Sequence, residues 1–361
     1  MKKLFLNLVF FITPIVIMVL IKQIYYVPSG DLGRLSKTIV SKKYRDFESK
    51  VISEFNDKRK FKLLTEIQEK KDENKTRVLI IGDSFSSGQG NYGFVNQLAE
   101  VKELEIVLYQ DLLRKKIEEN PTLALSGLIN GGYFNKYEFD YVVLQNVERY
   151  YLQRFDKDID NFIIHLDSIE NKIREPLNTN PNSLKESFSE ELNDFMLFYQ
   201  FNFSYQLNNR AFDSDVYKFP LSNSPFSYGN DLLVYYHDLV ERKLSPSIED
   251  LRKSVTVINQ MSKKLRTFNI DLISIIAPDK YDMYYSLIKK KENFPKPTFF
   301  KQYNSISKDH IELDCFKILS DSVSYNLKDI YFYDNTHWSP TGHEIISKNL
   351  EKLINKTNAQ H

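Results

Sequence analysis

The amino-acid sequence predicts an α/β protein in which a mainly parallel sheet lies between two layers of helices. Three apolar runs rich in β-branched residues carry this prediction, because they alternate with stretches of helical pattern. The runs are "RVLII" (77–81), "LEIVLYQ" (104–110) and "YVVLQ" (141–145). Helical patterns lie between them at 91–103 and 111–120. Strand, helix and strand in this order are typical of a parallel sheet.

The alternation stops after the third run and resumes later in the chain. Residues 151–230 are polar in part and rich in aromatics, with no regular period, and we interpret them as an insertion on the sheet. Its aromatic segment 195–206 fits either a hydrophobic plug or a groove on which a sugar stacks. A helix capped by Ser247 and a buried strand at 270–278 then continue the α/β pattern.

Composition limits the classes of function. Apolar residues make up 42% of the 361 residues, which is enough for a large core and excludes extensive disorder. The 49 basic and 48 acidic residues nearly cancel, so no overall charge favours nucleic acid as a partner. A single cysteine, Cys315, allows neither an internal disulfide nor a cysteine-based metal site. No motif calls for a metal or another cofactor.

The N-terminus predicts a membrane anchor. An apolar run of 18 residues, Leu4–Ile21, follows "MKK" and precedes Lys22, and that length just spans a bilayer. A cleaved signal peptide is the alternative, although no small-x-small cleavage site follows the run. We therefore expect a signal-anchor at 1–22, a helical connector or stalk at 23–75, and a main domain at 76–357 outside the cytoplasm.

The stretch "IGDSFS" (81–86) places Ser84 directly after the first predicted strand. Open α/β sheets bind ligands at the carboxyl ends of their strands, so a serine there is a candidate nucleophile. The alternative is that Ser84 is a turn residue, since Gly-Asp-Ser is also a common turn.

A base and a carboxylate follow near the C-terminus, in "DNTHWSPTGH" (334–343). Asp334 lies three residues before His337, so its carboxylate can orient the imidazole toward a serine. Ser339 and Pro340 predict that a helix begins just after this loop. His343 is the competing base, but it falls inside the predicted helix.

Together the two segments resemble the first and last sequence blocks of the SGNH (GDSL-type) hydrolase superfamily. The resemblance implies a flavodoxin-like three-layer fold with Ser84 as nucleophile, His337 as base and Asp334 as its orienting partner. "LQNVERY" (144–150), "IIAPDKYDMYY" (275–285) and "DNTHW" also look like membrane-anchored alginate O-acetyltransferases of the AlgX/AlgJ type and, more distantly, DltD. In the AlgX-like proteins the Asp/His motif precedes the serine motif, whereas here it follows.

The same resemblance suggests further site residues. Asn146 and the N–H of Ser84 would form the oxyanion hole with a glycine, for which Gly127, Gly131 and Gly132 are candidates. Arg149 and Lys280 lie in matching stretches, where they would contact an anionic substrate; the alternative is that they are solvated surface charges.

The expected function is therefore that of a serine-dependent acyl-ester enzyme. It would be an O-acetyltransferase or O-acetylesterase acting on a cell-envelope polysaccharide, with a membrane acyltransferase as a possible acyl donor. The rival hypothesis is a non-catalytic, membrane-anchored module that binds glycan or assists assembly.

Overall fold

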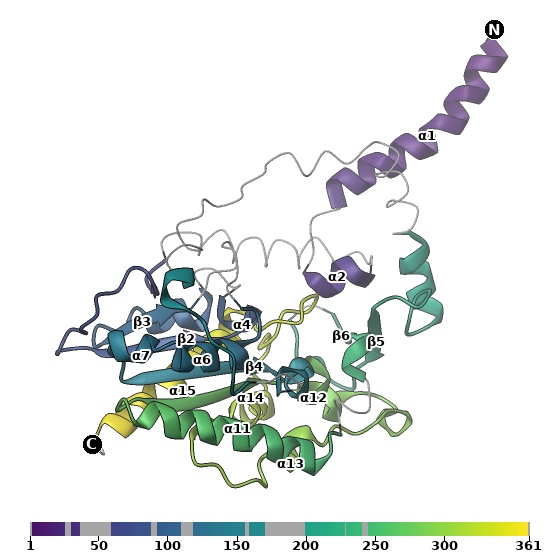
Figure 1. Cartoon of the computed structure of the whole chain (residues 1–361). Helices are drawn as coiled ribbons and strands as arrows, with labels where there is room; N and C mark the ends of the chain where they lie inside the picture. The colour runs from purple at the N-terminus through teal and green to yellow at the C-terminus, as the bar shows by residue number, and fades with distance from the viewer. Residues whose placement is uncertain are drawn as a thin grey trace.

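The structure is a computed structural model of the whole chain (Figure 1). It describes residues 2–25, 30–36, 59–87, 92–109, 118–155, 159–169, 199–227, 229–239 and 245–359. Parts of the predicted connector (26–29 and 37–58), of the predicted helix 111–120 and of the insertion (156–158 and 170–198) lie outside the described residues.

A six-stranded sheet forms the centre of the main domain, with the order β1-β3-β2-β4-β7-β8. Every neighbouring pair in it is parallel. The strands are β1 (Lys62–Leu63), β2 (Thr76–Ile81), β3 (Leu104–Leu108), β4 (Tyr141–Val147), β7 (Asp271–Ala277) and β8 (Ile311–Leu313). The predicted α/β class and the predicted strands at 77–81, 104–110, 141–145 and 270–278 are confirmed, each within a few residues.

Helices cover both faces of the sheet (Figure 1). One face carries α5 (Phe94–Leu98), α14 (Cys315–Ser324) and α15 (Pro340–Asn358), and the other carries α6 (Pro121–Asn130), α7 (Tyr133–Lys136), α11 (Ile248–Arg266) and α13 (Phe299–Tyr303). Successive residues of β2 serve the two cores in turn: Val78 and Ile80 face the first group of helices, and Leu79 and Ile81 face the second. The predicted three layers follow from this alternation.

The strand order places a topological switch at the end of β2. The next strand along the chain, β3, pairs with one edge of β2, and β4 pairs with the other. The two connections therefore leave the sheet in opposite directions, and the space between their starting points is open for a ligand. Short helical segments follow several strands along the chain: α4 (Ser84–Ser87) after β2, the 3-10 turns η2 (Glu148–Tyr150) and η3 (Leu152–Phe155) after β4, η4 (Tyr236–Leu239) after β6, and α12 (Lys280–Tyr284), η5 (Tyr285–Leu287) and η6 (Lys291–Asn293) after β7.

Part of the insertion is regular. Strands β5 (Val216–Pro220) and β6 (Asp231–Tyr235) form an antiparallel pair, so the inserted unit continues past residue 230. Residues 199–207 are helical. The connector is also not a separate stalk throughout, because β1 lies in the central sheet and α2 (Asp31–Ser36) contacts the hairpin through Leu32, Val216 and Leu233.

The predicted membrane anchor at 1–22, and with it the anchored, extracytoplasmic location, needs correction. Residues Lys2–Tyr25 form the helix α1, which contains Pro14. Within the part of the chain that the structure describes, no helix combines the length and the apolar character needed to cross a membrane. The expectation rested on an apolar run of 18 residues, which is at the lower limit for a bilayer.

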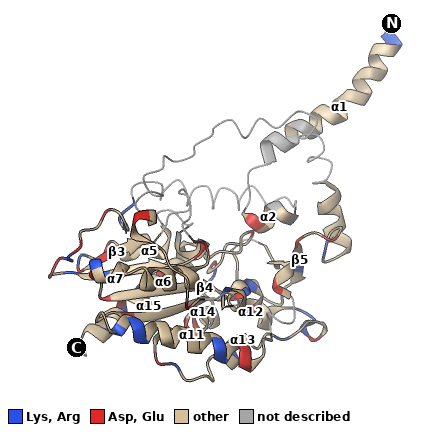
Figure 2. Cartoon of the chain, in the orientation of Figure 1, with Lys and Arg blue, Asp and Glu red and all other residues tan. Residues whose placement is uncertain are grey.

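The charged side chains agree with the balanced composition. In Figure 2, Lys and Arg residues are interspersed with Asp and Glu over the view shown. This agrees with the sequence, in which 49 basic residues are balanced by 48 acidic ones.

Candidate active site

The candidate nucleophile follows a tight turn at the end of β2. Gln145, on the neighbouring strand β4, accepts hydrogen bonds through Oε1 from the Asp83 N–H (3.0 Å) and from Ser86 Oγ (2.7 Å). A Cβ on Gly82 would lie 2.2 Å from Ser86 Oγ and 2.5 Å from Gln145 Oε1, so only glycine fits there. The turn therefore places Ser84 at the start of α4 with its backbone held against the sheet.

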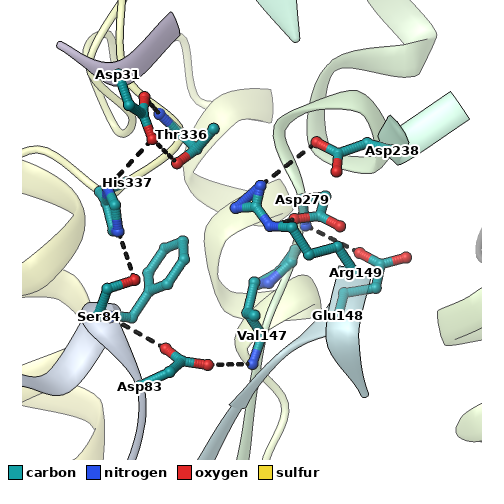
Figure 3. A network of polar contacts seen from close by, with 12 residues as sticks. Asp31, Asp83, Ser84, Val147, Glu148, Arg149, Asp238, Asp279, Thr336 and His337 are labelled. Atoms are coloured by element: carbon teal, nitrogen blue, oxygen red, sulfur yellow. Dashed lines mark hydrogen bonds and ion pairs between the residues drawn. The ribbon is translucent and has the colours of Figure 1, made fainter. Parts of the chain in front are cut away.

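Asp83 links this turn to the end of β4. Its Oδ1 accepts the N–H of Phe85 (3.1 Å), and its Oδ2 accepts the N–H of Val147 (2.8 Å) and Nη2 of Arg154 (2.8 Å). Figure 3 shows the bond to Val147 beside Ser84. Asp83 thus acts as a turn residue with a second, longer-range role in joining two strand ends.

The candidate base comes from the loop before α15. A bridge between Tyr331 and Trp338 closes the loop, and Ser339 caps the helix by accepting the N–H of Thr341 (3.1 Å), as its sequence predicted. His337 lies in this loop, and its Nε2 is 2.6 Å from Ser84 Oγ (Figure 3). The structure therefore brings the two predicted residues into direct hydrogen-bond contact.

The other ring nitrogen of His337 does not contact Asp334. His337 Nδ1 lies 2.6 Å from Asn335 Oδ1 and 3.9 Å from Asp31 Oδ2. The Asp334 carboxylate is fully buried and accepts the N–H of Gly30 through Oδ2 (2.7 Å). The prediction that Asp334 orients His337 is wrong in this geometry, because the backbone turns that carboxylate toward the N-terminal segment.

The surroundings keep His337 uncharged. Burial lowers the pKa of His337 below its usual value, and Arg149 lowers it further, whereas Asp31 and Asp83 act in the opposite direction. With a proton on Nδ1, which Asn335 Oδ1 accepts, Nε2 is left to take the proton of Ser84. The arrangement has the form of a nucleophile, a base and an amide that orients the base.

His343, the competing base, has a structural role. It is fully buried in α15, and its Nδ1 accepts the N–H of Phe94 (3.2 Å). Burial lowers its pKa to about 3, so it stays neutral as a packed ring against Phe94 and Trp338.

Ser84 and His337 line a cavity of about 420 Å³. It is lined by Asp31, Leu35, Asp83, Ser84, Phe85, Glu119, Val147, Arg149, Tyr150, Arg154, Tyr235, Thr336 and His337. These residues come from α2, the end of β2, the segment before α6, the end of β4 with η2 and η3, the hairpin and the loop before α15. The cavity therefore lies at the topological switch, where the strand order predicts a site.

Arg149 lines this cavity as predicted, but acidic side chains already surround it. Its Nε lies 3.2 Å from Asp279 Oδ1, and its Nη1 lies 3.4 Å from Asp238 Oδ2 (Figure 3). Burial opposes the charge, yet Asp279 and Asp238 outweigh burial and hold the pKa of Arg149 above its usual value. Arg149 is thus a permanently charged group at the cavity wall and not a solvated surface charge.

Two other predicted site residues lie away from the cavity. Asn146 is buried in β4, and its Oδ1 accepts a hydrogen bond from Arg154 Nη1 (2.6 Å). Lys280 is buried and donates through Nζ to the carbonyls of Phe332 (2.9 Å) and Tyr333 (2.8 Å). Burial lowers the pKa of Lys280 to about 7, opposed by Asp334. Neither residue lines the cavity; Lys280 instead supports the loop that carries His337.

The candidate glycines for the oxyanion hole are also elsewhere. Gly127 lies in α6, and Gly131 and Gly132 follow it. A Cβ on Gly127 or Gly131 would meet Ile164, on the opposite side of the sheet from α5 and α15. None of the three lines the cavity.

The structure adds three residues that sequence reasoning missed: Asp31, Arg154 and Asn335. Asn335 is adjacent to a predicted site residue, so its place in the motif was a usable signal. Arg154 lies just beyond "LQNVERY", whereas no local pattern marks Asp31, which is more than 300 positions from His337 in the chain.

Comparison with protein-family models, with curated proteins and with solved structures finds no match for this chain. Among the described residues, no group of three or more His, Cys, Asp or Glu side chains is arranged to hold a metal ion.

The contact between Asn335 and His337 predicts how the base titrates. In Asn335→Asp a carboxylate replaces the amide that lies 2.6 Å from Nδ1. Because a negative charge stabilises the imidazolium, the pKa of His337 should rise relative to the wild type. An NMR titration of the histidine ring resonances measures this shift. Asn293→Asp adds the same charge at an exposed position, and it should leave the pKa of His337 unchanged; an equal shift in both variants would contradict the contact.

Proposed function

We propose that this chain is a serine-dependent acyl-ester enzyme, an O-acylesterase or O-acyltransferase of the SGNH type. The observation that carries the proposal is the 2.6 Å contact between Ser84 Oγ and His337 Nε2 at the floor of a cavity. A serine hydroxyl is a weak nucleophile until a base accepts its proton, and this contact supplies that base.

The proposed reaction has two halves. Ser84 Oγ attacks the carbonyl carbon of an acyl ester while its proton moves to His337 Nε2. The tetrahedral intermediate then expels the alcohol, which takes the proton from His337, and the acyl group stays on Ser84. In the second half, water or a sugar hydroxyl gives its proton to His337 and attacks the acyl carbon. The bond from that carbon to Ser84 Oγ then breaks, His337 returns the proton to Ser84 Oγ, and the acid or a new ester is released.

Two guanidinium groups in the cavity wall would support the tetrahedral oxyanion, although the same wall also holds the carboxylates of Asp31, Asp83 and Glu119. Arg149 and Arg154 both line the cavity and are both mostly buried. A developing negative charge is stabilised more strongly by fixed charges in a site that excludes water than by charges in bulk solvent. The two arginines thus take the place that the sequence analysis gave to Asn146.

The character of the cavity favours an acylated sugar as the substrate. Its lining combines charged side chains with apolar ones, and Tyr150 and Tyr235 add aromatic side chains of the kind on which sugar rings stack. A volume of about 420 Å³ suits a short acyl group with one sugar unit. The polysaccharide and an acyltransferase that donates the acyl group stay predictions from the resemblance.

Replacement of either reacting residue should abolish turnover. Ser84→Ala and His337→Ala are each expected to lower the hydrolysis of p-nitrophenyl acetate by on the order of 10³-fold, because the nucleophile and its base act as one unit. Ser305→Ala and His165→Ala alter exposed residues of the same types and should retain wild-type rates. Wild-type turnover in Ser84→Ala or His337→Ala would contradict the proposal and favour a non-catalytic binding module.

Gly82, two residues before the nucleophile, should affect turnover only through the position that it gives to Ser84. In Gly82→Ala the new methyl would collide with Ser86 and Gln145. We expect turnover to fall roughly 10- to 100-fold, because a displacement near 1 Å at a nucleophile has that effect, with a loss of about 1–3 kcal/mol in stability. Gly127→Ala is the matched control: its methyl would lie 2.5 Å from Ile164, away from the cavity. It should lose similar stability with little change in turnover, and equal losses of turnover in both would refute a positional role for Gly82.

A further inference from the structure

The short segment 30–36 contacts the loop that carries the candidate base. Asp334 accepts the N–H of Gly30 through its carboxylate (2.7 Å) and the N–H of Gly33 through its backbone carbonyl (3.0 Å). The carboxylate predicted to orient His337 therefore holds this N-terminal segment in place. These contacts join residues about 300 positions apart in the chain.

In a second set of contacts, a side chain of the N-terminal segment accepts hydrogen bonds from the loop before α15. Asp31 Oδ1 accepts the backbone N–H of Thr336 (2.8 Å), and Asp31 Oδ2 accepts Thr336 Oγ1 (2.5 Å). The same Oδ2 lies 3.9 Å from Nδ1 of His337 (Figure 3). Asp31 thus binds Thr336, the residue before the base, and its carboxylate faces Nδ1 of His337, the ring nitrogen that does not contact Ser84.

The fit of the segment is steric as well as polar. A Cβ on Gly30 would lie 2.6 Å from the carbonyl oxygen of Asp334 and 2.7 Å from Cβ of Asn335, so the approach requires glycine. Leu32 is fully buried against Val216 and Leu233 of the β5–β6 hairpin. The segment is therefore seated between the loop before α15 and the hairpin, with Asp31 and Leu35 lining the cavity.

We propose that segment 30–36 is an integral part of the active site and that Asp31, in place of Asp334, supplies the carboxylate that supports His337. Asp31 is a positioning residue in this account: it fixes Thr336 and faces the imidazole without touching the substrate. When His337 accepts the Ser84 proton, its positive charge develops within ion-pair range of this carboxylate. The inference rests on the proposed function for its catalytic part, whereas the pairing of Asp31 with His337 is a separate physical claim.

The charged groups around His337 allow the claim to be tested by titration. Asp31, Arg149 and Asp83 affect the pKa of His337, and the ring of His343 also interacts with it. Asp31 raises this pKa, so a neutral side chain at position 31 should lower it. Asp334 is fully buried and turned toward Gly30. An asparagine at this position keeps an oxygen that can accept the Gly30 N–H, so Asp334→Asn should retain segment 30–36 and leave the pKa of His337 close to that of the wild type.

The experiment compares Asp31→Asn with Asp334→Asn in the full chain. The NMR titration of His337 should shift to lower pH in Asp31→Asn and not in Asp334→Asn. In Asp31→Asn, kcat for p-nitrophenyl acetate should also fall roughly 10- to 100-fold, which is less than the full contribution of an orienting carboxylate in a serine triad. Asp31→Glu retains the charge and should restore the titration toward the wild type, which a purely structural role for Asp31 would not do. Asp31→Ser is a second neutral variant in case Asp31→Asn fails to fold, as judged by thermal unfolding.

The outcomes separate the two proposals. A shift in Asp31→Asn or Asp31→Ser together with a loss of kcat supports the inference. An unchanged titration and unchanged kcat in the folded neutral variants overturns it, and so does a shift that appears in Asp334→Asn instead. If the wild type neither hydrolyses p-nitrophenyl acetate nor transfers its acetyl group to a sugar hydroxyl, but the titration shifts as expected, the proposed function fails, while the pairing of Asp31 with His337 is supported.

Discussion

The hydrogen bond between Ser84 and His337 is the contact on which the site depends, and it joins residues 253 positions apart. Neither residue could reach the other without the parallel sheet. The end of β2 delivers Ser84 at the topological switch, where Gln145 on the adjacent strand fixes the turn. The capped start of α15 fixes the loop from the other side, since Ser339 ends the loop and begins the helix. The order of the strands thus determines the chemistry that can occur at this edge.

Electrostatic balance is the second requirement. A base must be neutral before the reaction and cationic during it. Burial favours the neutral form and makes the cationic form more costly. Acidic groups near His337 offset that cost, while Arg149 and Arg154 add positive charge to the cavity wall. Each arginine is itself paired with carboxylates, which lowers the penalty of keeping a guanidinium out of water. Two groups of buried ion pairs, Arg154 with Asp83 and Arg149 with Asp238 and Asp279, therefore lie at the cavity that Ser84 and His337 line.

Local patterns predicted the central strands, the helix that begins after Ser339 and the positions of Ser84 and His337, because periodicity and caps depend on neighbouring residues. The direction in which a side chain points is not determined by neighbouring residues alone. Asp334 is an example: its spacing to His337 suited an orienting role, but its carboxylate points to Gly30. Strand β1 was missed because a two-residue strand has no readable period. The two hairpin strands were missed because their buried positions do not alternate along the chain. The contribution of Asp31 depends on packing between distant segments, which no local pattern records.

Covalent labelling of the nucleophile tests the central claim most directly. A fluorophosphonate reacts with a serine only when a neighbouring base activates the hydroxyl, so intact-mass measurement followed by peptide mapping reports on Ser84 itself. The account predicts a single adduct on the peptide that contains Ser84, absent from Ser84→Ala and strongly reduced in His337→Ala. An unmodified wild-type protein, or an adduct that persists in Ser84→Ala, would contradict it.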